Sequence, residues 1–160
     1  MEILLFVLFV CLGLILYQDL KFRKIHVAIP VVLFAMALYI FEEKTPYPYI
    51  IYILNLVFLS LILIFLVIYM SVKNKQFLNP FTNYFGLGDL LFYVAISPLF
   101  LTREYVLFFI CSMVFSIFLQ TGLKKIIKDT TVPLAGYSAF LLMLIVVKDL
   151  WLPLPKMTIL

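Results

Sequence analysis

The chain has 160 residues, of which 66% are hydrophobic and 12% are charged. An average soluble domain carries about 25% charged residues, so this composition excludes an ordinary soluble enzyme, a disordered protein and a nucleic-acid-binding domain. The formal net charge is +4, and the basic residues lie in short clusters between apolar runs, a pattern typical of loops that meet anionic lipid headgroups. We therefore expect a protein surrounded by membrane lipid, with no nucleic-acid partner.

The apolar runs predict an all-α membrane protein, a bundle of about six transmembrane helices that forms a single domain over residues 1–160. A bilayer core about 30 Å thick needs roughly 20 apolar residues per helix. The fourth and sixth runs are short for such a core, and Tyr93 and Pro98 in the fourth suggest a helix shielded by its neighbours. The expected spans cover residues 3–20, 25–41, 48–72, 89–101, 105–123 and 133–147. The first should be retained, since no basic segment of a cleaved signal precedes it.

The distribution of Lys and Arg predicts the orientation, because positive residues are retained on the cytoplasmic side of a membrane. Most of them lie in the first, third and fifth connections, so we expect these loops to face the cytoplasm and both termini to lie outside the cell's inner membrane. The connection 73–85 has the mixed polar and aromatic composition of an interfacial loop. The basic residues of the three loops are Lys21, Arg23, Lys24, Lys73, Lys75, Lys124, Lys125 and Lys128.

The two cysteines predict neither a metal site nor a disulfide. Cys11 and Cys111 lie in different apolar runs, without the paired spacing of a zinc site or the even framework of a disulfide-rich domain. We expect no metal and no cofactor.

Two carboxyl groups lie at unusual positions. Asp19 closes the first expected span and Asp89 opens the fourth, which places both at the cytoplasmic level of the membrane. An ionisable group at the centre of a membrane helix costs roughly 2.5 to 3.5 kcal/mol, so it is a functional hypothesis by default. The other acidic residues are expected in loops or near a chain end: Glu2, Glu42, Glu43, Glu104, Asp129 and Asp149.

Each of the two acids also has a structural interpretation. Asp19 can pair with Arg23 one helical turn later, and Asp89 can cap the amino end of its helix. Neither interpretation requires the two carboxyl groups to share one level of the membrane.

Two carboxyl groups around one water can hydrolyse an amide, since one takes a proton from the water while the other polarises the carbonyl. The helix dipole favours the anion at an amino end and disfavours it at a carboxyl end. We therefore expect Asp89 to be the general base and Asp19 to hold the shared proton. Gly86 and Gly88 let the backbone turn tightly beside Asp89 and approach a bound peptide. A GxG pair without a preceding strand or third glycine does not indicate a dinucleotide site.

These residues resemble the motifs of the prepilin peptidases, which are intramembrane aspartyl proteases of the GxGD type. The resemblance lies in residues 19–25 (Asp-Leu-Lys-Phe-Arg-Lys-Ile), in 86–89 (Gly-Leu-Gly-Asp) and in 133–139, which is similar to the opening of the family's last helix. It implies a peptidase that removes the basic leader of type IV prepilins or pilin-like precursors used in pilus and secretion systems. The chain is too short for the methyltransferase activity and the CxxC insert of larger members, which implies the compact form.

The resemblance assigns catalysis to Asp19 and Asp89. It assigns positioning of the catalytic acid or the substrate to Gly86, Gly88, Lys21 and Arg23. The chain departs from the family pattern at Leu91, where Lys is frequent, and at positions 26–27, where His-Val replaces Pro-Asn. A structural role at headgroup level is the favoured interpretation of the single histidine, over a proton relay. Presenilin-like proteases also use GxGD, but their Tyr-Asp and Pro-Ala-Leu motifs are not matched.

Two other functions are compatible with the sequence. A small transporter or an assembly subunit can use membrane carboxyls to bind a proton or a cation, although transport favours acids near the midplane and repeated halves. A degenerate homologue can bind pilin-like helices without cutting them.

Overall fold

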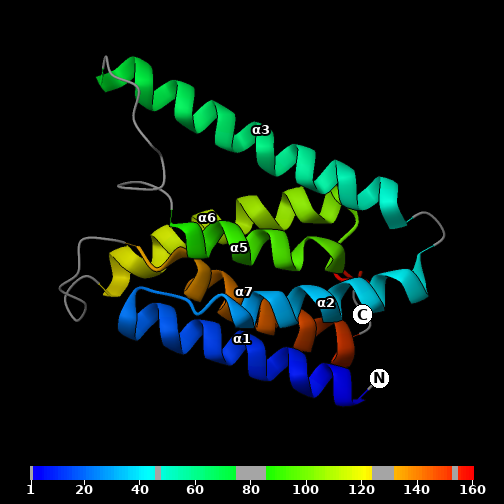
Figure 1. Cartoon of the computed structure of the whole chain (residues 1–160). Coiled ribbons are helices and arrows are strands. Elements are labelled where there is room, and N and C mark those ends of the chain that lie inside the picture. The colour runs from blue at the N-terminus through cyan, green and yellow to red at the C-terminus, as the bar shows by residue number, and fades with distance from the viewer. Residues whose placement is uncertain (1, 46–47, 75–85, 124–131, 153–154) are drawn as a thin grey trace.

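The structure is a computed structural model that describes residues 2–45, 48–74, 86–123, 132–152 and 155–160 (Figure 1). Every regular element in these ranges is helical, which confirms the all-α prediction. In lipid the backbone has no water to satisfy its polar groups, so apolar runs of this length fold as helices. The elements are α1 (Glu2–Phe22), α2 (Ala28–Lys44), α3 (Pro48–Asn74), α5 (Leu87–Ile96), the 3-10 helix η1 (Ser97–Leu99), α6 (Thr102–Leu123) and α7 (Leu134–Trp151).

Four of these helices are long and apolar enough to cross a membrane: α1, α3, α6 and α7. The other two are shorter, with 17 residues in α2 and 10 in α5. At 1.5 Å per residue α5 is about 15 Å long, half the thickness of a bilayer core. The prediction of a helical membrane bundle is thus confirmed, and α5 is a buried half-length helix within it.

Helix boundaries differ from the predicted spans by three or more residues in four helices. The second helix begins and ends three residues late, α5 ends at Ile96 rather than at 101, α6 begins at Thr102 rather than at 105, and α7 ends late. The second helix begins at Ala28 rather than at residue 25, because the chain turns at Arg23, whose φ of 54° lies in the left-handed region. The last helix continues to Trp151, four residues beyond its predicted end. The third continues to Asn74, so Lys73 is helical; the rest of the expected interfacial loop, together with Lys75, Lys124, Lys125, Lys128 and Asp129, lies outside the described residues.

The helices alternate in direction, and the two termini lie at the same end of the molecule (Figure 1). The carboxyl end of α1 and the amino ends of α5 and α7 lie at the opposite end. Helix α7 packs mainly on α1 and α6, and α5 packs on α2, whereas α3 crosses obliquely and diverges from the other helices toward its carboxyl end. Much of the surface of α3 therefore carries exposed apolar side chains.

A buried asparagine satisfies the end of the short helix α5. Helix α5 passes into η1 at Ser97, and the last carbonyls at a helix end have no partners within the helix. Asn55 of α3 is fully buried and donates from Nδ2 to the carbonyls of Ser97 at 2.9 Å and Phe100 at 3.1 Å. Tyr93 and Pro98 are both buried, which confirms the prediction that neighbouring helices shield the fourth apolar run.

Candidate active site

Helix α1 places Asp19 in the interior because the residue continues the buried face of that helix. Leu8, Leu12 and Ile15 are fully buried, and they precede Asp19 at the three- and four-residue spacing of one helical face. Asp19 itself is 7% exposed. The same packing that buries the apolar face of α1 therefore carries the carboxyl group into the bundle near the last turn of the helix.

Helix α5 carries Asp89, which is half-buried, in its first turn. Phe92, Tyr93 and Ile96 are fully buried and follow Asp89 on one face of the helix. Asp89 is the third helical residue after Gly86, and its Oδ2 accepts the Gly86 N–H at 3.2 Å. The capping role expected for Asp89 is thus present, and it occupies one carboxylate oxygen.

The amino end of α7 brings the two carboxyl groups together. The Ala135 N–H donates to Oδ1 of Asp89 at 2.7 Å, and the Gly136 N–H donates to Oδ2 of Asp19 at 2.6 Å. First-turn amides have no acceptor within their own helix, and the helix dipole favours anions at this end. Two acids that are 70 positions apart in the sequence thus bind consecutive amides of one helix, close enough for the charge of Asp19 to act on Asp89.

This arrangement changes the expected division of roles between the acids. Asp19 lies at the carboxyl end of α1, yet it also faces the amino end of α7. Both carboxyl groups therefore receive the favourable end of a helix dipole, so the dipole argument by itself does not assign the base and the proton holder.

Two glycines allow the close approach of the three helices. A Cβ on Gly136 would lie 3.1 Å from Oδ2 and 3.2 Å from Cβ of Asp19. A Cβ on Gly88 would lie 3.1 Å from Cδ1 of Ile25, in the turn after α1. Small residues at these contacts let the backbones pack closely, as in other membrane helices.

Gly86, the first glycine of the 86–89 motif, lies against Asp89 itself. A Cβ on Gly86 would lie 2.9 Å from Oδ2 of Asp89, so any side chain there would displace the capping carboxylate. Of the two glycines predicted as positioning residues, Gly86 therefore lies against Asp89 itself, whereas Gly88 packs against Ile25.

The basic residues of the first motif separate into two groups. Arg23 has its Nε and Nη1 atoms shielded from solvent, and its charge acts on Asp19, Asp89 and Tyr137. Lys21 is exposed, and its amino group donates to the Tyr17 hydroxyl at 2.7 Å. Of the two basic residues predicted to act at the site, the structure thus brings Arg23 to the carboxyl pair and leaves Lys21 on the outer surface of α1.

The turn that presents Arg23 is held by local hydrogen bonds. The Arg23 N–H donates to the Asp19 carbonyl at 3.2 Å, and the His26 N–H donates to Oε1 of Gln18 at 2.9 Å. Nδ1 of His26 accepts the Ala28 N–H at 3.4 Å, at the start of α2. His26 is exposed, and this contact places it at the start of α2.

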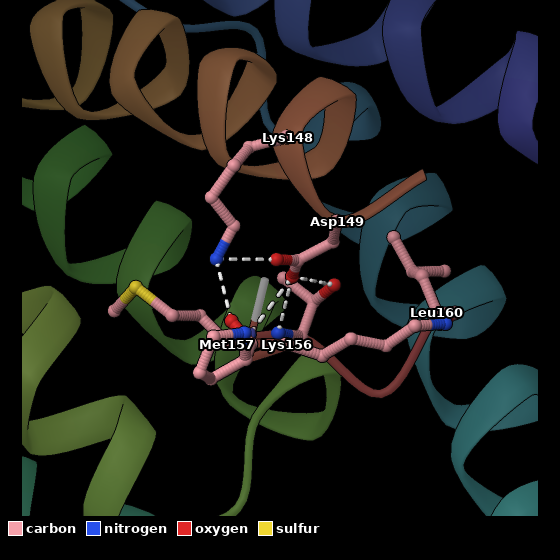
Figure 2. A network of polar contacts seen from close by, with 7 residues as sticks. Lys148, Asp149, Lys156, Met157 and Leu160 are labelled. Atoms are coloured by element: carbon pink, nitrogen blue, oxygen red, sulfur yellow. Dashed lines mark hydrogen bonds and ion pairs between the residues drawn. The ribbon is translucent and has the colours of Figure 1, made fainter. Parts of the chain in front are cut away.

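Another acid, Asp149, is also buried in the structure. It was expected in a loop or near a chain end, but it lies within α7 and is 3% exposed. Figure 2 shows its carboxyl group directed at the C-terminal segment, where Oδ2 accepts the N–H groups of Met157 at 3.0 Å and Thr158 at 2.7 Å and the Thr158 hydroxyl at 2.8 Å. Oδ1 forms an ion pair with Lys148 at 2.7 Å. Asp149 is helical and buried because α7 continues past its predicted end and residues 155–160 fold back over it, which no local pattern indicates.

The remaining candidates from the sequence lie apart from the carboxyl pair. Cys11 on α1 is buried and Cys111 on α6 is exposed, and both are free thiols. Within the described ranges, no group of three or more His, Cys, Asp and Glu side chains is arranged to hold a metal ion.

The comparisons with known proteins give no relative: no protein-family model matches the chain, and neither a curated protein nor a solved structure shows significant similarity to it.

Proposed function

We propose that this chain is an intramembrane aspartyl endopeptidase, and that Asp19 and Asp89 are its catalytic residues. The observation that carries the proposal is the binding of the two carboxyl groups to consecutive amides at the amino end of α7. Structural acids in a membrane bundle pair with cations or saturate their oxygens with donors. Here the two acids bind neighbouring amides of one helix end, and two carboxyl groups around one water molecule are sufficient to activate it.

In the proposed reaction one carboxylate accepts a proton as the water oxygen bonds to the peptide carbonyl carbon. The other carboxylic acid donates its proton to the carbonyl oxygen, which gives a neutral tetrahedral intermediate. The carbon–nitrogen bond then breaks, the leaving nitrogen takes a proton from the acid formed in the first step, and the second carboxylate takes a proton from a hydroxyl of the intermediate. Arg23 supports this scheme because its positive charge offsets the negative charge of the pair when one proton is shared.

The substrate class follows from the resemblance to prepilin peptidases. We propose that the enzyme removes the basic leader of type IV prepilins or pilin-like precursors, beside their hydrophobic helix. The carboxyl pair belongs to the end of the bundle opposite the two termini, which agrees with the proposed orientation in the inner membrane: first, third and fifth loops cytoplasmic, termini outside. Cleavage would then occur at the cytoplasmic face.

Co-expression with a candidate prepilin tests the proposal. We expect the wild-type chain to shorten the precursor by the mass of its leader, and Asp19→Asn and Asp89→Asn to leave the precursor intact although both variants reach the membrane. Glu43→Gln, at an exposed position near the end of α2, is the control for loss of an acidic residue and should cut normally. Shortening that persists in both aspartate variants would exclude the proposed chemistry.

A further inference from the structure

A buried cluster of three hydroxyl groups joins the helices around the candidate site. The Tyr93 hydroxyl of α5 lies 2.7 Å from Oγ of Ser112 on α6 and 2.9 Å from Oγ of Ser138 on α7. All three residues are buried. We call Tyr93, Ser112 and Ser138 the hydroxyl cluster.

The hydroxyl cluster lies one helical turn from the carboxyl pair along two of its three helices. Tyr93 follows Asp89 by four residues on the same face of α5, and Ser138 follows Ala135 and Gly136 by three and two residues on α7. The bond between Tyr93 and Ser138 therefore joins the helix that carries Asp89 to the helix whose amides bind both acids. Any sliding or rotation of α5 against α7 would change this bond and the Ala135–Asp89 bond together.

The cluster is also fixed from outside. Oγ of Ser112 lies within 2.8 Å of the Phe109 carbonyl, and the Tyr105 hydroxyl donates to the Tyr93 carbonyl at 3.0 Å. The Tyr93 ring packs against Phe92 and Phe109. The hydroxyl is thus held in place by contacts that do not involve the carboxyl pair, as a positioning device requires.

We propose that Tyr93 is a positioning residue of the peptidase: its hydroxyl fixes α5 on α7 so that Asp89 meets Ala135 while Asp19 meets Gly136. This inference rests on the proposed function for its effect on cleavage and on the helix packing for its effect on geometry. The two effects are measured separately.

The kinetic test uses two serines of α6 as a matched pair. Ser112 and Ser116 are both buried and both bond a carbonyl of their own helix, but of the two it is Ser112 that bonds Tyr93. We expect Tyr93→Phe and Ser112→Ala to lower kcat by about tenfold to a hundredfold, since small misplacements of catalytic groups have effects of this size. KM should stay unchanged, because the substrate-binding surface is not altered. Ser116→Ala should retain the wild-type kcat; equal losses in the two serine variants would overturn the positioning role.

The geometric test needs no substrate. Leu87 and Val132 are exposed beside the amino ends of α5 and α7, so nitroxide labels on cysteines at these positions report the spacing of the helix ends in a chain carrying Cys11→Ala and Cys111→Ser. We expect Tyr93→Phe to broaden the label–label distance distribution in the electron paramagnetic resonance spectrum, and Ser116→Ala to leave it unchanged. An unchanged distribution in Tyr93→Phe would overturn the inference even if the wild type cuts prepilins. A broadened distribution in a chain that cuts no precursor would support the positioning geometry and count against the peptidase alone.

Discussion

The two ends of α7 hold buried acids in opposite ways. At the carboxyl end Asp149 accepts three hydrogen bonds on Oδ2 and forms an ion pair with Lys148 through Oδ1, so each oxygen has a partner (Figure 2). At the amino end, in the described part of the chain, the Asp19 side chain accepts one hydrogen bond, from Gly136. Asp89 accepts two, each on a different oxygen.

The difference teaches how to separate a structural carboxylate from a reactive one inside a membrane protein. A carboxylate has about four acceptor sites, and a structural acid uses most of them, because an unsatisfied buried charge is costly. Asp149 meets that description. Asp19 and Asp89 use fewer of their acceptor sites in the described part of the chain, as the proposed reaction requires for the binding of a water molecule.

The largest effect should come from replacing the acids at the two ends of α7 by their amides. We expect Asp19→Asn or Asp89→Asn to lower the cleavage rate by about a thousandfold or more, the scale of lost general acid–base catalysis. Asp149→Asn should cut at the wild-type rate but lose about 1 to 3 kcal/mol of stability, because bonds to a buried charged acceptor are weakened. Cleavage assays combined with unfolding in detergent measure both quantities. If Asp149→Asn lost cleavage activity while it kept the stability of the wild type, the distinction between the two ends would be contradicted.

The next effect concerns the close contact at the amino end of α7. Gly136→Ala would place a methyl group 3.1 Å from Oδ2 of Asp19, and we expect cleavage to fall by about tenfold to a hundredfold through displacement of that acid. Gly122→Ala is the matched control, since a Cβ there meets nothing within 4 Å. It should cut normally and gain about 0.5 to 1 kcal/mol of stability from higher helix propensity. Steady-state kinetics of the two variants show whether the close contact is required.

A smaller effect is expected at Asn55, which supports the far end of α5. Asn55→Leu removes the donors to Ser97 and Phe100 and should lower the free energy of unfolding by about 1 to 2 kcal/mol. Ser60→Ala on the same helix removes an exposed hydroxyl bonded to its own helix at Leu56 and should have almost no effect. Equal stability of these two variants would contradict a structural role for Asn55.

The smallest effect should be local to the C-terminal segment. Thr158→Val removes one of the donors to Asp149 while keeping the backbone bonds, so we expect faster amide hydrogen exchange in residues 155–160 with unchanged cleavage. Hydrogen exchange measured by mass spectrometry checks this. Lys156→Gln is the comparison, because it alters a contact to the Leu160 carbonyl instead and so separates the contribution of Asp149 from that of Lys156. Wild-type exchange in Thr158→Val would show that Asp149 holds the segment through the backbone amides.

Much of the fold could be predicted because membrane burial leaves a strong signal. The long apolar runs located α1 and α3 within about two residues at each end, since only helices satisfy the backbone in lipid. The late start of α2 could not be predicted, because it depends on a left-handed residue at Arg23 and on a His26 contact, and neither is marked by hydropathy.

The candidate site was predictable in its acids and not in their partners. Asp19 and Asp89 stood out because charged groups are rare beside apolar runs. Their carboxyl oxygens accept hydrogen bonds from the backbone amides of Ala135 and Gly136. Every residue except proline carries such an amide, so the residue types at these positions do not indicate the contact. The fold-back that buries Asp149 depends on tertiary packing of residues 155–160 and was missed for the same reason.

The occupied amides of Ala135 and Gly136 have a consequence for inhibitor chemistry. Serine-type peptidases hold the oxyanion on backbone amides, but here the two amides at the centre of the site already bind carboxyl oxygens. In the proposed reaction the tetrahedral oxygen is therefore held by the protonated acid. Compounds with a hydroxyl in place of the scissile carbonyl, such as statine-like peptides, should therefore inhibit this protein, whereas warheads that need an amide-lined anion pocket should not.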